Sequence, residues 1–355
     1  MASFARGEPD LATRFGRVSL SNSSRPQSEG EEGPPLRVIS TLDEAIEDEL
    51  RTAFGGATTL ALDAEGVDLG RHGRLSIVQL STPEACFLFD VLGKGPIHPL
   101  VAWLRGPLED EGVVKIIHDC QMDSDALHHL LGINLANVHD TSCWMATLSG
   151  KTHKGLNDTL EYFGVPSNSA RGGVSVYTTN HAYWATRPLT EQMIQRAAGD
   201  VQGMFELQTR QLERLEAEGD RAEALKLRAE KKSSTFLTWA RGAETEHVEV
   251  QNVGRFIGKR GATIIDLKRR TNTLIYERGT RGRGNFLVYY DNASSLRTVQ
   301  RSATGGQGGG YGGRGSSGSR SYGSRSYGSG SYGGGNSGGC GRYYDSDDSN
   351  DGGFE

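Results

Sequence analysis

Residues 60–82, LALDAEGVDLGRHGRLSIVQLST, contain the features that decide the fold. Apolar side chains dominate residues 58–65 and 75–80, and both stretches predict strands. Asp63 and Glu65 close the first strand, and a two-residue spacing on a strand places both side chains on one face of the sheet. The sequence therefore predicts a sheet that carries two carboxylates at one strand end.

Strands and helices continue through the first 215 residues. Residues 86–90 predict a strand that forms a hairpin with residues 75–80, and residues 113–117 predict a buried strand. Helices are predicted at residues 41–50, 99–104, 122–131, 140–148 and 156–163. Strands first, then strand and helix in alternation, indicate an α/β domain with a mixed sheet.

A long helix is predicted to open at Thr190, which is a natural N-cap residue. Its apolar face is formed by side chains at three-to-four spacing: Met193, Ala197, Val201, Met204 and Phe205. Asp200 falls within roughly 60° of three of these positions on a helical wheel. Its carboxylate is therefore expected to point inward.

Four carboxylates thus stand among predicted core residues: Asp63, Glu65, Asp123 in the 122–131 helix, and Asp200. A buried carboxylate needs a partner, because an isolated buried charge costs several kcal/mol. Few basic residues lie nearby in the sequence, so we expect cations. Two Mg²⁺ or Mn²⁺ ions about 4 Å apart, bound by such oxygens, can activate a water for phosphodiester hydrolysis. Three of these residues also have a structural interpretation: a strand end for Asp63, an N-cap for Asp123 and a salt bridge for Asp200.

Three segments carry a family resemblance. Residues 60–82, KIIHDCQMDSDAL at 115–127 and RPLTEQMIQRAAGDV at 187–201 resemble the three motifs of the DEDD 3′-5′ exonuclease domain, in its RNase D and Egalitarian-type branch. The resemblance covers about residues 60–207 and implies an RNase H-like fold, with a mixed five-stranded sheet flanked by helices. It also implies that Asp63 and Glu65 are the first metal-binding pair, Asp123 the second-motif aspartate and Asp200 the third-motif aspartate.

Arg196 departs from this family pattern. The RNase D branch carries a tyrosine four residues before the last aspartate, where the phenol orients the attacking water. A guanidinium stays protonated and cannot accept a proton from water. The sister branch uses a histidine one position earlier, where this chain has Gln195, which a continuous helix turns ~140° away from Asp200. Either Arg196 holds the scissile phosphate or pairs with Asp200 in an active enzyme, or the pocket binds nucleic acid without cutting it.

Residues 244–302 predict a second, basic module. Its central feature is the G-x-x-G loop formed by Gly258, Lys259, Arg260 and Gly261, which lies between two helical segments and is flanked by three predicted strands. This order resembles a KH domain, whose glycine loop lets the backbone approach the phosphates of a single strand. Lys259 and Arg260 would supply positive charge there. The closing helix at residues 293–301 is short, and the alternative is a helix-turn with solvated lysines.

Composition divides the chain into five segments. We expect a disordered leader at 1–36, the exonuclease-like domain at 37–215, a polar helical linker at 216–243, the KH module at 244–302 and a disordered Gly/Ser/Tyr/Arg-rich tail at 303–355. From residue 305 onward the tail contains no Val, Ile, Leu or Met, so it cannot offset the entropy of ordering its backbone. The linker's polarity suits a spacer better than a core element.

The net charge of −5 includes contributions from an acidic segment and a basic segment. Residues 37–200 contain 21 acidic against 12 basic side chains, and residues 244–301 contain 11 basic against 6 acidic ones. The four cysteines form no C-x-x-C pair and predict reduced core thiols. No apolar run approaches the ~18 residues of a membrane span. We therefore expect a soluble protein of the cytoplasm, with the nucleus as the alternative.

These features together predict a divalent-metal-dependent 3′-5′ exonuclease that acts on RNA or single-stranded nucleic acid. The KH module would hold the substrate, and the tail would contact RNA or adapter proteins. One alternative is a catalytically silent RNA-binding adapter of the Egalitarian type. The other is an exonuclease that processes DNA, since a KH module also accepts single-stranded DNA.

Overall fold

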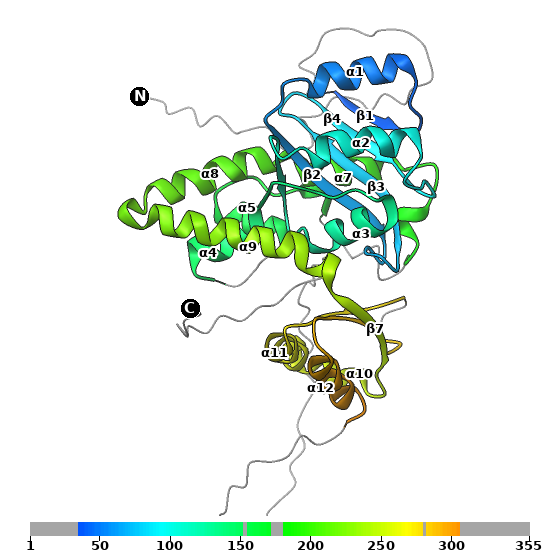
Figure 1. Cartoon of the computed structure of the whole chain (residues 1–355), viewed down its shortest axis with the longest axis vertical. Coiled ribbons are helices and arrows are strands. Elements are labelled where there is room, and N and C mark those ends of the chain that lie inside the picture. Colours follow the sequence, from blue (N-terminus) through cyan, green and yellow to red (C-terminus); the bar gives the residue numbers. More distant parts are fainter. Residues whose placement is uncertain (1–34, 152–154, 172–179, 280–281, 306–355) are drawn as a thin grey trace, which may run out of the picture.

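The computed structural model describes residues 35–151, 155–171, 180–279 and 282–305. They form a larger α/β module, and a smaller module lies below it in Figure 1. Nearly all of the predicted disordered tail and of the predicted leader lies outside the described residues. None of the described helices is both long and apolar enough to cross a membrane.

The larger module is built on one six-stranded sheet. Its strands are β1 (Leu36–Ile39), β2 (Thr59–Val67), β3 (Arg74–Ser81), β4 (Cys86–Asp90), β5 (Val114–Ile117) and β6 (Val138–Asp140). The order across the sheet is β1-β4-β3-β2-β5-β6. Strands β2, β3 and β4 pair antiparallel, whereas β1, β5 and β6 each pair parallel with a neighbour. The predicted mixed sheet and the hairpin of β3 and β4 are confirmed.

The sheet has six strands and not the five that the resemblance implied. No strand was predicted at either β1 or β6. These two edge strands contain four and three residues, too few for an alternating pattern to stand out from the flanking sequence.

Helices cover both faces of this sheet. They are α1 (Glu44–Phe54), α2 (Pro99–Glu109), α3 (Gln121–Leu131), α4 (Thr141–Ser149), α5 (Leu156–Tyr162), α7 (Glu191–Gln202), α8 (Met204–Glu216) and α9 (Ala222–Gly242). Leu60 and Leu62 of β2 share one hydrophobic core with residues of α1, α2 and α3. Ala61, between them, packs in a second core with α7. Asp63 and Glu65 follow Ala61 at intervals of two residues and so point to the same face of β2 as Ala61, toward α7.

The helix predicted to open at Thr190 begins as expected. The Thr190 hydroxyl accepts a hydrogen bond from the Met193 amide at 3.3 Å, as an N-cap does. The helix stops at Gln202, however, and α8 starts again after Gly203. A Cβ atom at Gly203 would lie 3.1 Å from a methyl group of Leu160, so glycine lets α5 pack closely at this break.

The segment expected to be a spacer is helical, but α9 packs against the larger module. Its buried residues Ala229, Ser233, Leu237 and Ala240 recur at three-to-four spacing. Ser124 Oγ on α3 donates to the Leu237 carbonyl at 2.6 Å, and the Asp140 amide donates to Ser233 Oγ at 3.3 Å. Small side chains on one face let α9 pack close to α3 and α4. Because the helix is polar on average, its composition does not reveal this buried stripe.

The smaller module contains a three-stranded antiparallel sheet in the order β7-β9-β8. Its elements are β7 (Glu244–Glu249), α10 (Val253–Ile257), α11 (Ala262–Thr271), β8 (Leu274–Glu277), β9 (Asn285–Tyr290) and α12 (Ala293–Ala303). Val248, Phe256, Leu267, Phe286 and Val299 form part of its core. The predicted order of strands and helices is present, and the closing helix extends two residues beyond its expected end. Assignment of this module to the KH class stays a prediction.

Three cysteines within the described residues, Cys86, Cys120 and Cys143, are buried free thiols. Burial raises the pKa of all three thiols, so they remain protonated. They are core residues, as expected. Cys340 lies outside the described residues.

His139 on β6 has a buried imidazole ring whose protonation makes the stability of the fold depend on pH. The ring stacks on Trp144 with 4.2 Å between centroids, and its Nε2 donates to Gln211 Oε1 at 2.9 Å. Burial lowers the pKa of His139 to about 4. In the unfolded chain a histidine pKa is about 6.5. Below that pH the unfolded state binds a proton that the folded state does not, so folding stability is lost as pH falls.

We therefore expect the wild type to lose more stability than His139→Gln when the pH is lowered from about 8 to about 5. The additional loss in its free energy of unfolding should be about 2 kcal/mol. Urea unfolding at the two pH values measures this difference. Comparing each protein with itself removes the constant cost of the substitution. Equal losses in both proteins would show that His139 does not titrate in this way.

Candidate functional site

Asp63 and Glu65 lie on β2 where that strand leaves its regular register. Asp63 stands opposite Gln79 and Glu65 opposite Ile77, and a bulge follows between Glu65 and Gly66. A Cβ atom at Gly66 would lie 2.2 Å from the Arg74 carbonyl oxygen, so only glycine fits this bulge. Glu65 is buried and Asp63 is half-buried. Both carboxylates lie on one face of the sheet, as predicted, and this face is the one covered by α7.

Asp123 is placed by the turn between β5 and α3. Asp119 in this turn has a positive φ of 60°, and the amides of Asp119 and Cys120 donate to the Asp140 carboxylate at 3.1 and 2.8 Å. The same carboxylate caps α4 through the Ser142 amide at 2.9 Å. Asp140 therefore fixes the start of α3. Asp123 lies in the first turn of that helix and is 5% exposed.

Asp200 is buried on α7 and is held by two side chains from the segment that follows α5. Asn168 Nδ2 donates to Asp200 Oδ1 at 2.6 Å and also lies 3.1 Å from the Arg196 carbonyl oxygen. Arg171 Nε donates to the same Asp200 oxygen and forms an ion pair with it. A Cβ atom at Gly199 would lie 2.6 Å from Asn168, so this glycine lets the asparagine lie against the helix.

Three of the four predicted carboxylates converge. One oxygen each from Asp63, Glu65 and Asp200 lies within 4.8 Å of the others. Asp123 is outside this group, but besides burial, which is the main cause, the charges of Asp63 and Glu65 raise its pKa, so it adjoins them. We call these four residues the carboxylate pocket.

Burial and mutual repulsion raise the pKa values in the carboxylate pocket. Burial, followed by the charge of Asp200, raises the pKa of Asp63 to about 7. Burial, followed by the charge of Asp63, raises the pKa of Glu65 and of Asp123 well above the usual range. Ionising this pocket without a positive partner is therefore costly.

Arg171 and Arg196 supply positive charge at the pocket, and the charges of both guanidinium groups act to lower the pKa of Asp63 and Glu65. The expectation that few basic residues lie near the carboxylates was therefore wrong. An ion pair with Asp200 was considered for Arg196. Among the described contacts, the residue that forms this ion pair is Arg171. Arg196 itself is 7% exposed on the inner side of α7.

Sequence reasoning missed Asn168 and Arg171 because they lie in an irregular segment without apolar periodicity. Gly199 could have indicated a close neighbour, because glycine inside a helix costs about 1 kcal/mol relative to alanine unless packing requires it. Gln195, by contrast, behaves as expected. Its Nε2 donates to Glu191 at 2.8 Å, away from Asp200.

The donor set of the pocket fits a hard divalent cation. Asp123 Oδ1 and Asp200 Oδ2 are buried and have no hydrogen-bond partner within the described part of the chain. Carboxylate oxygens are the ligands that Mg²⁺ and Mn²⁺ prefer. Divalent cations bound here would give these oxygens partners and lower the repulsion among the four carboxylates.

The predicted G-x-x-G loop connects α10 and α11 in the smaller module. Gly258 and Gly261 have φ values of 74° and 86°, and Arg260 between them has a φ of 56°. A Cβ atom at Gly258 would lie 2.1 Å from Thr263 Oγ1, so glycine is required there. Lys259 and Arg260 are exposed. The loop therefore presents open backbone and two positive charges to solvent.

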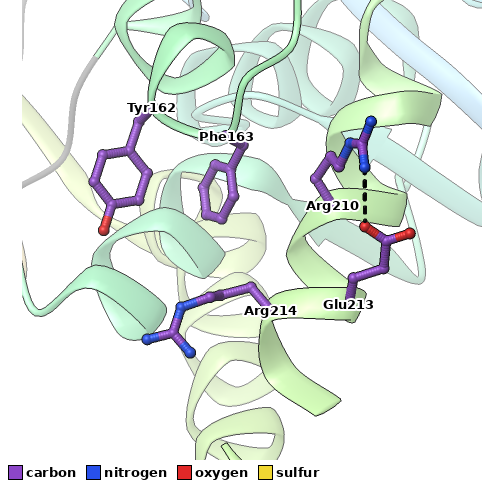
Figure 2. Close-up of a pocket in the computed structure, with 5 residues that line it drawn as sticks. All are labelled: Tyr162, Phe163, Arg210, Glu213 and Arg214. Carbon is purple, nitrogen blue, oxygen red and sulfur yellow. Dashed lines mark hydrogen bonds and ion pairs between the residues drawn. The ribbon is translucent and has the colours of Figure 1, made fainter. Parts of the chain in front are cut away.

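A shallow surface hollow of about 410 Å³ lies between the end of α5 and α8 (Figure 2). It is lined by Tyr162, Phe163, Arg210, Glu213 and Arg214. Arg210 pairs with Glu206 and Glu213, and Arg214 pairs with Glu218. Because neighbouring glutamates already neutralise these charges, we assign no ligand to this hollow.

Comparison with known proteins supports the motif resemblance. Residues 38–216 match a family model described as 3′-5′ exonuclease. The chain is 39% identical over 103 residues to the piRNA biogenesis protein EXD1 of Xenopus laevis, covering 27% of this chain and 23% of that protein. It is 29% identical over 172 residues to exosome complex component 10 of Rattus norvegicus, covering 48% of this chain and 18% of that protein. The chain thus spans less than a third of the length of these relatives.

Among solved structures, the RNase D of Trypanosoma brucei superposes with a TM-score of 0.48 at 26% sequence identity. The superposition covers 58% of this chain and 73% of that one.

Proposed function

Because the chain belongs to the 3′-5′ exonuclease domain family, we propose that it is a divalent-metal-dependent 3′-5′ exonuclease acting on RNA or another single-stranded nucleic acid. The observation that carries this proposal is the convergence of Asp63, Glu65 and Asp200 within 4.8 Å, beside Asp123. Burying four carboxylates from three separate elements together costs free energy, and a cation bound by them would explain why they are placed together.

In this proposal Asp63, Glu65, Asp123 and Asp200 hold the divalent ions, which supply a Lewis acid and an activated water when bound. Arg171 and Arg196 place two guanidinium groups at the same pocket. Because a guanidinium stays protonated, neither residue takes a proton from water, and both are suited to bind and orient the phosphodiester.

The choice of RNA rests on two supports. Relatives of the chain include proteins named for piRNA biogenesis and for the exosome. The loop at Gly258–Gly261 offers exposed backbone beside Lys259 and Arg260, as a KH module does for a single strand. We propose that residues 244–302 bind the substrate strand while its 3′ end occupies the carboxylate pocket.

We expect RNA labelled at its 5′ end to be shortened progressively from its 3′ end when Mg²⁺ or Mn²⁺ is present, and to stay intact with a chelator. Denaturing gel electrophoresis resolves the ladder of products. Single-stranded DNA and duplex DNA of the same sequence, run in parallel, distinguish RNA from DNA preference. Intact RNA with every divalent ion would overturn the enzyme proposal.

A second candidate is an RNA-binding adapter that does not cut. The specific observation in its favour is positive charge where an active RNase D-type site has a tyrosine: Arg196 occupies that position and Arg171 binds Asp200. Tight RNA binding in a gel-shift assay, together with no cleavage at any metal, would favour this adapter. Cleavage that depends on the carboxylates would exclude it.

A further inference from the structure

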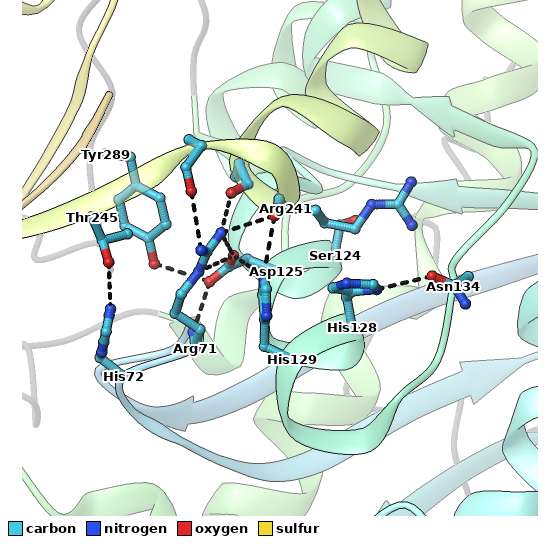
Figure 3. A network of polar contacts seen from close by, with 12 residues as sticks. Arg71, His72, Ser124, Asp125, His128, His129, Asn134, Arg241, Thr245 and Tyr289 are labelled. Atoms are coloured by element: carbon cyan, nitrogen blue, oxygen red, sulfur yellow. Dashed lines mark hydrogen bonds and ion pairs between the residues drawn. The ribbon is translucent and has the colours of Figure 1, made fainter. Parts of the chain in front are cut away.

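The two modules meet in a polar network centred on Arg71, in the turn between β2 and β3 (Figure 3). Arg71 Nε donates to Asp125 Oδ1 at 2.9 Å, and its guanidinium also donates to main-chain carbonyls at the end of α9, including that of Ala243 at 3.0 Å. The Tyr289 hydroxyl on β9 donates to Asp125 Oδ2 at 2.9 Å. Asp125 is fully buried and is paired with Arg71 inside the larger module, and Tyr289 adds a hydrogen bond to it from the smaller module.

The turn between β2 and β3 is shaped for this docking. Gly70 has a φ of 127°, and a Cβ atom there would lie 2.9 Å from the Tyr289 hydroxyl. Arg278 of the smaller module donates to the carbonyls of Asp68 and His72 at 2.7 and 2.8 Å. The turn that follows the Asp63 and Glu65 strand therefore holds the second module in one orientation.

Apolar contacts place the second module on the first turn of α3. Tyr289 and Leu287 of β9 form a buried cluster with Ala240 and Ala243, and Met122 packs against that cluster together with Tyr276. Met122 immediately precedes Asp123 of the carboxylate pocket. The second sheet thus lies directly beside the element that carries one of the four carboxylates.

Lys268 on α11 is a basic side chain at this interface. Its Nζ lies 5.5 Å from the Tyr276 ring centroid, and Tyr276 lies edge-on to Tyr289 at 6.0 Å. Burial and Asp140 raise the pKa of Asp119 to about 7, and the charge of Lys268 acts in the opposite direction. Asp119 in turn acts on the pKa of Asp123. Lys268 therefore lies at the module interface: it is over the Tyr276 ring, and Tyr276 packs against the same cluster as Met122, the neighbour of Asp123.

We propose that Lys268 binds the substrate phosphate next to the scissile one, so that the second module completes the substrate path of the first. This inference rests on the proposed function. The charges of Arg171 and Arg196 act on Asp63 and Glu65 of the pocket, whereas Lys268 lies over the Tyr276 ring at the module interface, beside the first turn of α3. In this proposal Arg171 and Arg196 bind the scissile phosphate, and the Lys268 ammonium group binds the next phosphate of the strand.

An acidic pocket needs such a group, because a polyanionic strand that approaches it is repelled by the same charges that bind cations. A lysine ammonium is a compact charge on a flexible stem and suits a phosphate without fixed geometry. Docking of the module through Arg71, Asp125 and Tyr289 keeps this charge in place without a contribution from the substrate.

The test measures binding of a 5′-fluorescein trinucleotide of uridine with phosphorothioate linkages, in Ca²⁺, by fluorescence anisotropy. This probe is long enough for the pocket and one neighbouring phosphate. We expect Lys268→Met to weaken binding by about tenfold, and the slope of log Kd against log salt to fall by about 0.7, as for one lost contact to a single strand. Arg269→Met is the matched control, because Arg269 pairs with Asp266 and is 52% exposed.

A second probe carries a neutral methylphosphonate at the neighbouring linkage. The wild type should bind it about tenfold more weakly than the charged probe, whereas Lys268→Met should bind both probes equally well. Thermal unfolding shows that both variants are folded. An unchanged Kd for Lys268→Met, an equal loss in Arg269→Met, or a wild type that binds no trinucleotide would overturn the proposal. Because binding is measured without cleavage, a protein that binds as expected and never cuts overturns the exonuclease proposal alone.

Discussion

Glu65→Gln is expected to remove RNA cleavage and to leave the metal-free protein at least as stable as the wild type. Glu65 is 7% exposed, and burial among like charges raises its pKa well above the usual range. Glutamine has the same shape without the charge, so the substitution relieves repulsion in the metal-free pocket. It also removes a ligand for the divalent ions, and we expect the cleavage rate to fall by about 10³-fold.

The opposite directions of these two effects separate a functional loss from a folding loss. Single-turnover cleavage measures the first, and thermal unfolding with and without Mn²⁺ measures the second. Mn²⁺ should raise the melting temperature of the wild type and not that of Glu65→Gln. Glu84→Gln, the same substitution at an exposed position in the β3–β4 turn, is the control and should change neither quantity. Full cleavage by Glu65→Gln would remove this residue from the site.

The parts of the site on regular elements could be predicted from the sequence. A period of two places Asp63 and Glu65 on one face of β2, and a period of 3.6 places Asp200 on the inner face of α7. Both periods depend on neighbouring apolar residues, and Ala61, Ala197 and Val201 are indeed in one core. Asp123 followed from the buried strand before it, since the chain leaves β5 at the edge where β2 also ends.

The parts that depend on tertiary contacts could not be predicted. Arg171 and Asn168 lie in a segment without periodicity, and their partner Asp200 is about thirty residues away. Likewise, Arg71 belongs to a polar turn whose sequence gives no indication that it would bind Asp125 and the end of α9. α9 was interpreted as a spacer because its buried stripe consists mostly of Ala and Ser, which contribute little to hydrophobic periodicity. Each of these misses concerns a contact between distant segments, and composition and local spacing carry no information about such contacts.

The ion pair of Arg171 with Asp200 leads to the second large expected effect. Arg171 supplies positive charge to the pocket in the metal-free protein, and its side chain is 24% exposed. Arg171→Met leaves buried carboxylates without that charge, and we expect the metal-free protein to lose about 3 kcal/mol of stability. Mn²⁺ should restore most of the loss, because the cation supplies the missing positive charge. Since no guanidinium competes for Asp200 in the variant, Mn²⁺ should also bind about tenfold more tightly.

Arg187→Met is the matched control for this prediction. Arg187 forms a bidentate ion pair with Asp90, with both contacts at 2.7 Å, and its side chain is 25% exposed. Asp90 lies on β4 and is not part of the carboxylate pocket. Breaking this pair should destabilise the protein equally with and without Mn²⁺, because no cation replaces the lost charge there. Calorimetric titration with Mn²⁺ and thermal unfolding of both variants provide the comparison. A loss in Arg171→Met that Mn²⁺ leaves unchanged would mean that Arg171 is a structural partner of Asp200 and does not compete with a cation for the pocket.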